Sequence, residues 1–160
     1  MGVHSFVHDV KVKVSESRLF KALITESHQV LPKLSTGIKS IEFVQGNTMA
    51  PGCVYNMNFV EGAPFKYIKS RMDSIDYENR SCKFANIEGD ILGDKFAKIC
   101  HELKVEAAGD GESVVKLKTE YHTEGGYEPT EMEINGAKAH AEGMYKMVEE
   151  YMLANPTVCA

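Results

Sequence analysis

The sequence predicts an α+β fold, in which a curved antiparallel sheet packs against one long helix near the C-terminus. Seven short strand-like segments come first, and a helical pattern then covers residues 130–153. The breaks between the later segments are short and rich in Gly, Asn, Asp and Pro, as hairpin turns require. An antiparallel sheet with its helices on one side is a common α+β arrangement. We therefore expect a single domain over residues 1–160 with one core.

Each element has its own local signal. Residues 3–14 alternate between apolar and charged side chains, which is typical of a half-buried strand. Ser15 can cap a short helix, and a second short helix that begins at Thr25 or Ser27 should stop near Pro32. Two such helices can form a V. The further strands are expected at residues 39–45, 53–60, 65–73, 80–87, 96–107 and 113–121.

The C-terminal helix predicts unfilled space between itself and the sheet. Thr130 and Glu133 have the spacing of a capping box, which marks the start of the helix. Helical periodicity suggests that the inward face carries small and polar residues, namely Gly136, Ala139, His140 and Gly143. Because small side chains fill little volume, we expect a ligand pocket between this helix and the curved sheet.

Composition excludes several classes of partner. The formal net charge is −5 and the basic residues are scattered, so no nucleic-acid partner is expected. No segment is apolar and long enough to cross a membrane, and residues 1–10 lack the pattern of a signal peptide. The four cysteines form no CxxC pair, and no carboxylate is visibly paired with a histidine as a metal ligand. We expect a cytoplasmic monomer that needs no cofactor and no metal.

Six stretches of the sequence resemble the birch pollen major allergen family, the intracellular plant pathogenesis-related proteins of class ten. They follow the family's order along nearly the whole chain: LFKAL (19–23), VLPK (30–33), EGAPFKYIKSRMDSID (61–76), IEGDILGD (87–94), LKTEYHTEGG (117–126) and VEEYMLANP (148–156). The tail and the first two stretches are similar to the phenolic-coupling-protein-like subgroup.

The resemblance implies the helix-grip fold, in which seven antiparallel strands wrap round the long helix and enclose a large internal cavity. It also implies a plant defence-related protein that binds amphipathic small molecules in that cavity. The ligand classes usual in the family are flavonoids, cytokinins and other hormones, sterol-like lipids, and alkaloid or phenolic metabolites.

Residues 45–52, QGNTMAPG, depart from the family's glycine-rich loop, which commonly reads like EGDGGPG. Thr48 and Met49 stand where glycines are usual. The stretch also lacks the GK[ST] ending of a phosphate-binding loop, so hydrolysis of a nucleoside triphosphate is not expected. Tyr55 replaces a lysine that relatives commonly carry near this loop, so the ligand-anion contact of that lysine is not expected here.

Strand alternation assigns one face of each strand to the cavity. Between residues 65 and 72 the alternation is ambiguous, and the resemblance favours Phe65 and Tyr67 as inward. The candidate ligand-binding residues are Tyr55, Met57, Phe59, Phe65, Tyr67, Cys82, Phe84, Ile99, His101, Leu103, Tyr121, Gly136, His140 and Met144. A hydrogen-bonded core histidine is the simpler interpretation of both His101 and His140. Either imidazole could instead bind a polar group of a ligand or transfer a proton.

Three functional hypotheses follow. The first is a binding protein for storage or transport, which needs no catalytic residues. The second is an enzyme of plant specialised metabolism that carries out a condensation, isomerisation or cyclisation with His101 or His140 and Tyr67. Relatives that condense amines with aldehydes use a lysine, a carboxylate and a tyrosine, and this set is absent from the inward positions. The third is a ribonuclease, which needs two acid–base groups, whereas a candidate such as Glu102 is expected to face outward.

Overall fold

The structure, a computed structural model, describes residues 2–34 and 37–160. Its centre is one antiparallel sheet of seven strands in the order β1-β7-β6-β5-β4-β3-β2. The strands are β1 (Val3–Val12), β2 (Ile38–Gln45), β3 (Val54–Phe59), β4 (Tyr67–Asp76), β5 (Ser81–Gly89), β6 (Phe96–Ala107) and β7 (Ser113–Thr123). From β2 to β7 each strand pairs with the next one in the sequence, as hairpins do. The predicted strands are thus confirmed, each to within a few residues at its ends.

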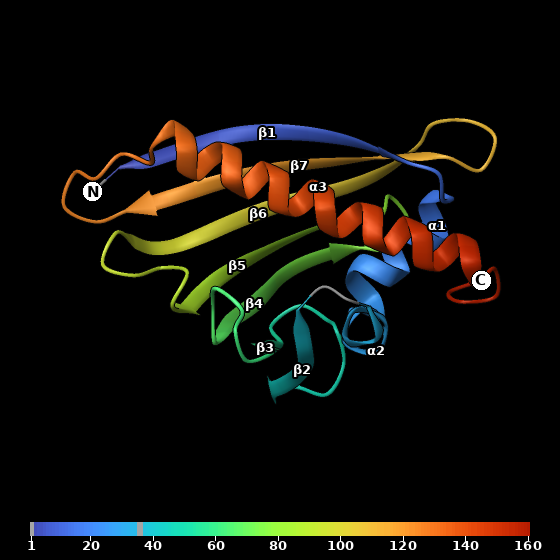
Figure 1. Cartoon of the computed structure of the whole chain (residues 1–160), viewed down its shortest axis with the longest axis horizontal. Coiled ribbons are helices and arrows are strands. Elements are labelled where there is room, and N and C mark those ends of the chain that lie inside the picture. The colour runs from blue at the N-terminus through green and yellow to red at the C-terminus, as the bar shows by residue number, and fades with distance from the viewer. Residues whose placement is uncertain (1, 35–36) are drawn as a thin grey trace.

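Short helices connect the two edge strands, β1 and β2 (Figure 1). These elements are α1 (Glu16–Phe20), a π-helical turn (Lys21–Thr25), α2 (Ser27–Val30) and a 3₁₀ turn (Leu31–Lys33). Ser15 occupies the cap position of α1 with an extended backbone, but its side chain makes no capping hydrogen bond. Pro32 lies in the 3₁₀ turn, because a proline inside a longer helix would remove one of its backbone hydrogen bonds.

The long helix α3 (Glu131–Ala154) lies across one face of the sheet and begins with the expected capping box (Figure 1). The backbone N–H of Glu133 donates to the Thr130 hydroxyl at 3.1 Å, and the Thr130 N–H donates to the Glu133 carboxylate at 3.1 Å. These two bonds satisfy N–H groups that have no partner within the helix. Across residues 2–34 and 37–160, no helix combines the length and the apolar character that a membrane span requires.

The side of α3 that faces the sheet is not the one expected from the sequence. The buried residues of this helix are Tyr145, Val148 and Met152. Gly136, His140 and Gly143 are exposed, and a Cβ atom added to either glycine would meet no atom within 4 Å. Burying a bulky apolar side chain removes more apolar surface from water than burying glycine, so the helix turns its bulky residues to the core. The prediction that the small residues face the sheet is therefore wrong, and they lie on an exposed flank of α3.

The C-terminal end of α3 is held by Arg18 of α1. The guanidinium group donates hydrogen bonds of 2.9–3.3 Å to the backbone carbonyls of Met152, Asn155 and Val158. The last carbonyls of a helix have no partners within it, and a cation there also interacts favourably with the helix dipole. Closer to the middle of the helix, the Lys146 ammonium group donates to the Lys11 carbonyl at 2.8 Å, so α3 is also bound to β1.

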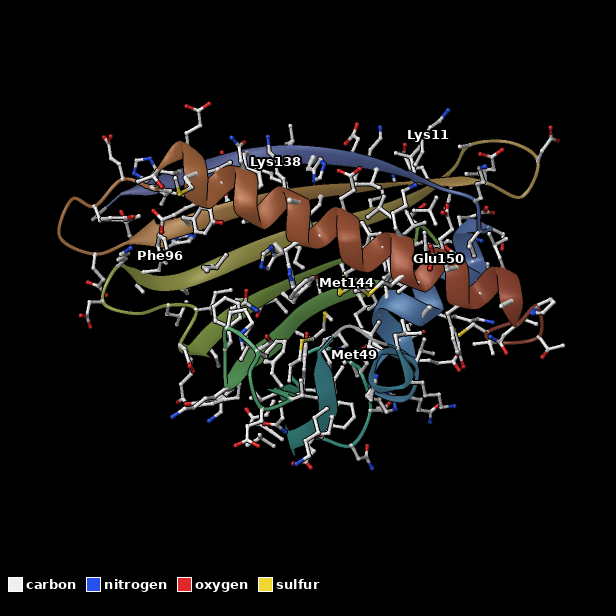
Figure 2. All side chains as sticks on the ribbon, viewed as in Figure 1. Lys11, Met49, Phe96, Lys138, Met144 and Glu150 are labelled. Atoms are coloured by element: carbon white, nitrogen blue, oxygen red, sulfur yellow. The ribbon has the colours of Figure 1, made fainter. Side chains whose placement is uncertain are left out.

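Apolar side chains gather in two clusters, which Figure 2 places at different points along α3. Met144 belongs to the edge of the main core, whereas Phe96 belongs to a smaller cluster near the start of the helix. Met49 reaches the main core from the loop at residues 45–52, and its sulfur lies 3.8 Å from the Cys53 sulfur. A glycine at this place could not make that contact. The altered loop is therefore anchored to the core by its own side chain.

Candidate ligand-binding site

The face of the sheet that is turned toward α3 is here called the inner face, and no Asp, Glu, Lys or Arg of the described strands lies on it. Residues paired directly across antiparallel strands share a face, so the strand register fixes its members. Starting from the buried pair Val10 and Val115, the pairing leads from strand to strand to Ile41 and Phe43 on β2. Among the described strand residues on this face, none is Asp, Glu, Lys or Arg. The strands therefore present no carboxylate, ammonium or guanidinium group to this space, whereas α3 brings the Lys138 Nζ atom to 5.3 Å from the centre of the inner-face Phe6 ring.

A chain of hydrogen bonds crosses this inner face through five neighbouring strands. The His101 Nδ1 atom lies 3.0 Å from the Thr119 hydroxyl, and the His101 Nε2 atom lies 2.8 Å from the Asn86 Oδ1 atom. The Asn86 amide donates to the Ser70 hydroxyl at 2.9 Å, and Ser70 is hydrogen bonded in turn to Tyr55. We call these five residues the polar row. It runs from β7 to β3, one residue on each strand, through an otherwise largely apolar wall.

Burial keeps His101 neutral, and the polar row fixes its tautomer. The Asn86 Oδ1 atom can only accept a hydrogen bond, so Nε2 carries the proton and Nδ1 accepts from the Thr119 hydroxyl. Burial lowers the pKa of His101 from 6.5 to about 4, because a charged imidazolium loses its hydration. The imidazole ring also packs against Phe84, with 4.9 Å between ring centroids. Both nitrogens therefore have partners, as in a structural core histidine.

Tyrosine and cysteine groups of the inner face are held in their uncharged forms as well. Burial raises the pKa of the Tyr55 phenol, and the nearby Cys82 and Cys53 thiols raise it further. Burial also raises the pKa of the Cys82 thiol to about 12 and raises the pKa of Tyr121. A thiol with so high a pKa is not a nucleophile near pH 7. The polar row and these residues thus offer hydroxyl, amide, thiol and imidazole groups.

Three predicted ligand-binding residues meet at a second feature, which we call the rim pocket. Phe59, Phe65 and His140 line this pocket of about 370 Å³, together with Gly37 and the β3–β4 connection at residues 60–64. The rings of Phe59 and Phe65 meet edge to face, with centroids 6.1 Å apart. The His140 side chain comes from the exposed flank of α3. The rim pocket therefore lies between that flank and the β3–β4 connection.

Tyr67 is a correction to the sequence prediction, because it lies on the outer face. It pairs with Asn58 on β3, whereas Ile68 and Ser70 pair with the inner-face residues of that strand. The Tyr67 hydroxyl donates to the exposed Glu88 carboxylate at 2.8 Å. The apolar and polar residues of this segment alternate weakly, and Ser70 is buried only because Asn86 and Tyr55 bond to it. Consequently Tyr67 does not approach His101.

Most of the other predicted residues do lie on the inner face of the sheet. These residues are Tyr55, Met57, Phe59, Cys82, Phe84, Ile99, His101, Leu103 and Tyr121. Met57, Phe84 and Met144 are only partly buried, so side chains do not fill all the space around them. Sequence reasoning did not find the bonds of Ser70, Asn86 and Thr119. Alternation places Asn86 and Thr119 on this face, but only the strand register brings them to His101 and Ser70.

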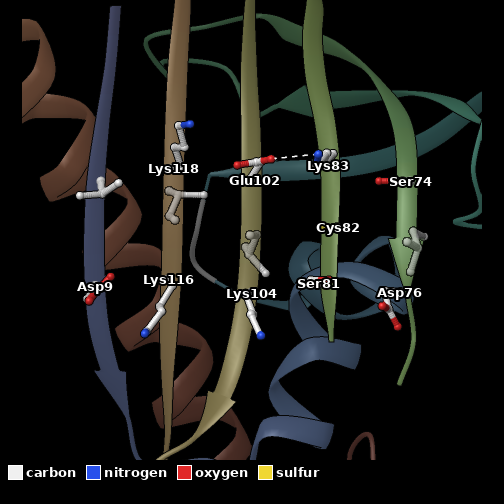
Figure 3. Close-up of a pocket in the computed structure, with 14 residues that line it drawn as sticks. Asp9, Ser74, Asp76, Ser81, Cys82, Lys83, Glu102, Lys104, Lys116 and Lys118 are labelled. Atoms are coloured by element: carbon white, nitrogen blue, oxygen red, sulfur yellow. Dashed lines mark ion pairs between the residues drawn. The ribbon is translucent and has the colours of Figure 1, made fainter. Parts of the chain in front are cut away.

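A larger pocket, of about 610 Å³, lies on the outer face of the sheet, away from α3 (Figure 3). Its lysines have acidic partners: Lys83 with Glu102 at 3.1 Å, Lys104 and Lys116 with Glu106 at 3.6 and 3.0 Å, and Lys118 with Glu120 at 3.7 Å. Glu102, the acidic candidate of the ribonuclease hypothesis, is thus on the outer face and paired. Exposed ion pairs of this kind contribute little to stability or recognition. The ionic groups of this region therefore belong to the outer face, opposite the polar row.

Comparison with known proteins agrees with this architecture. The model of the Pathogenesis-related protein Bet v 1 family matches residues 1–155. Pathogenesis-related protein STH-2 of Solanum tuberosum is 43% identical over 160 residues, which cover 100% of both chains. The crystal structure of Ara h 8.0201 matches with a TM-score of 0.84 and 31% identity, and covers 96% of this chain and 100% of that chain. A norcoclaurine synthase point mutant from Thalictrum shares the fold at 20% identity, with a TM-score of 0.74 and 98% of each chain covered. The chain therefore belongs to the Pathogenesis-related protein Bet v 1 family.

Proposed function

We propose that this protein binds amphipathic small molecules between the inner face of the sheet and α3, and that it stores or carries them in the cytoplasm of plant cells as a monomer. The proposed ligand classes are flavonoids, cytokinins and other hormones, and alkaloid or phenolic metabolites. The observation that carries the proposal is the polar row within an otherwise largely apolar inner wall. Binding sites for small molecules typically combine an apolar lining with a few placed polar groups.

The side chains around the polar row support the binding of varied ligands. Phe84 and His101 form a ring pair on which a flat aromatic molecule can pack. Met57 and Met144 are partly buried on either side of the space between sheet and helix. Methionine side chains are unbranched and flexible, so they can adjust to ligands of different shape. The rim pocket at Phe59, Phe65 and His140 is the proposed route by which a ligand reaches this space.

Storage or transport fits the arrangement of the three catalytic candidates better than acid–base catalysis does. His101 uses both nitrogens within the polar row, and its low pKa leaves it neutral near pH 7. Tyr67 lies on the outer face, bonded to Glu88. His140 stands at the rim pocket. An acid–base pair must reach the same reacting group, and these three residues are on different surfaces.

A fluorescence titration tests the proposal. N-phenyl-1-naphthylamine is uncharged and becomes fluorescent in apolar surroundings, so saturable enhancement is expected on addition of the protein. His140→Trp should narrow the rim pocket and slow association by about tenfold, because a bulky ring blocks the proposed route. Ala139→Trp is the matched control, since this exposed neighbour on α3 does not line the rim pocket. Absence of saturable binding to the unmodified protein would contradict the proposal.

A further inference from the structure

We propose that the end of the inner site beside β1 binds the carboxylate group of an aromatic ligand, and that Lys138 of α3 selects this group. The inference rests on the proposed function, because it names a head group and its place within the same site. Two observations carry it. A band of partly exposed side chains crosses the inner face beneath α3, and an ammonium group without an acidic partner stands at the β1 end of that band.

The band of partly exposed side chains runs across neighbouring strands of the inner face. His8 on β1 pairs with Leu117 on β7, and His101 on β6 pairs with Phe84 on β5. Leu117 and His101 are diagonal neighbours, because Leu117 pairs with the next inner residue of β6. All four side chains are only partly buried, although α3 lies across the sheet. The core therefore leaves space along this band.

The helix presents little volume to the same space. Ile134 of α3 packs against the smaller apolar cluster and Met144 against the main core. Between these two residues, the helix positions that are partly buried are Ala137, Lys138 and Ala141, and the others are exposed. Two alanines fill little of the gap between the clusters, so a flat aromatic body has room between them and the band. Lys138 is then the polar group that the helix offers to such a ligand.

The Lys138 ammonium group stands on the β1 side of α3 (Figure 2). Its Nζ atom lies 5.3 Å from the centre of the Phe6 ring, and Phe6 is the inner residue of β1 next to His8. Among residues 2–34 and 37–160, Lys138 forms no ion pair and no hydrogen bond through its side chain. An ammonium group carries three donors, and contact with a ring face uses none of them as a hydrogen bond. A ligand carboxylate would supply the missing acceptor.

The adjacent His8 offers a second group without a partner. Its Nδ1 atom is buried and has no hydrogen-bond partner among the described residues. Buried polar atoms in folded proteins are normally hydrogen bonded, so a partner from a ligand would improve this site. A carboxylate has two oxygen atoms, and one can accept from Lys138 while the other accepts from a proton on Nδ1. The β1 end of the band thus matches the shape and the bonding of a carboxylate.

Glu142 brings the opposite charge to this region, but its placement favours a carboxylate ligand over an ammonium ligand. Its carboxylate lies 3.9 Å from the His8 Nε2 atom, and its side chain is 56% exposed. Water and salt weaken the attraction between so exposed a charge and a ligand cation. Lys138 is partly buried and would also repel an ammonium group. The charge that a ligand meets beneath the helix is therefore mainly that of Lys138.

Calorimetric titration of the full-length protein near neutral pH with 2-naphthoate, 2-naphthol and 2-naphthylmethylammonium tests the inference. We expect 2-naphthoate to bind more tightly than 2-naphthylmethylammonium, by about fivefold or more. Lys138→Met keeps the length and the apolar stem of the side chain, so it should weaken 2-naphthoate about three- to fivefold and change 2-naphthol less than about twofold. Lys146→Met is the matched control. It removes the same charge about two turns farther along α3, where Lys146 already has the Lys11 carbonyl and Glu149 as partners, and it should leave 2-naphthoate binding unchanged.

Reversal of the charge gives a second, independent outcome. Lys138→Glu should invert the order, so that 2-naphthylmethylammonium binds more tightly than 2-naphthoate, whereas Lys146→Glu should keep the order of the unmodified protein. Unchanged 2-naphthoate affinity in Lys138→Met, or an equal loss in Lys138→Met and Lys146→Met, would overturn the inference. N-phenyl-1-naphthylamine carries no carboxylate, so it still binds in that case and the proposed function stands. If neither it nor the three naphthalene derivatives bind the unmodified protein, the proposed function fails too.

Discussion

His101→Gln is expected to reduce the acid sensitivity of the fold, because the buried imidazole is neutral in the folded protein. The pKa of His101 is about 4 when folded, against 6.5 for an ordinary histidine. Between these values the unfolded chain binds more protons than the folded one, so stability falls as the pH falls through this window. Above it the imidazole is neutral in both states, and below it both are protonated. From about pH 7 to about pH 5 the difference amounts to roughly 2 kcal/mol.

Thermal unfolding at these two pH values measures the effect. The midpoint of the unmodified protein should fall by about 4–8 °C more than that of His101→Gln, since 1 kcal/mol corresponds to about 2–4 °C in a domain of this size. Thr119→Val is the control, because it removes a partner of His101 but keeps the imidazole. It should lower stability at both pH values and keep most of the pH dependence. If His101→Gln and the unmodified protein lose the same stability on acidification, the neutral buried imidazole is refuted.

The remaining predictions concern stability and are checked by urea unfolding. Arg18→Ala should lower the free energy of unfolding by about 1–3 kcal/mol, because several carbonyls at the end of α3 lose a charged donor; no loss would contradict the role of this residue. Gly89→Ala should destabilise, since its backbone has a φ of 128° and a Cβ atom would clash with the Tyr67 carbonyl oxygen. Gly136→Ala should instead stabilise by about 0.5–1 kcal/mol, because the site is an open helical position. Destabilisation by Gly136→Ala would argue against the exposed flank. Thr130→Ala should cost about 1 kcal/mol through loss of the helix cap, and an unchanged midpoint would contradict the capping box.

The strands could be predicted from local sequence, because alternation and turn residues act over a few positions. The family resemblance added the helix-grip topology, and the structure confirms the seven-stranded sheet and the long helix. Which face of α3 packs against the sheet could not be predicted from local sequence in the same way. Gly136, His140 and Gly143 form one stripe at helical spacing, and Tyr145 and Val148 belong to another. Periodicity identifies both stripes, but which one is buried depends on the volume available against the sheet.

The polar row depends on contacts between residues far apart in sequence. Thr119 meets His101 because β7 pairs with β6, and Asn86 meets Ser70 because β5 pairs with β4 across a bulge. A buried serine looks like a surface residue in a local pattern, so alternation was ambiguous here, and the family resemblance favoured Tyr67 as inward. The sequence alone could predict only that a histidine on an apolar strand face, such as His101, is hydrogen bonded within the core. Its partners required the register of the whole sheet.

Methionine methyl resonances test the central claim most directly, because methionines stand both at the proposed site and away from it. Met57 lies on the inner face and Met144 on α3 beside the main core, whereas Met132 is 83% exposed near the start of that helix. The protein would be labelled with ¹³C at the methionine methyl groups and titrated to saturation with 2-naphthol. Binding between the sheet and α3 predicts shifts of the Met57 and Met144 resonances and an unchanged Met132 resonance. Saturation that leaves Met57 and Met144 unshifted would contradict an inner binding site.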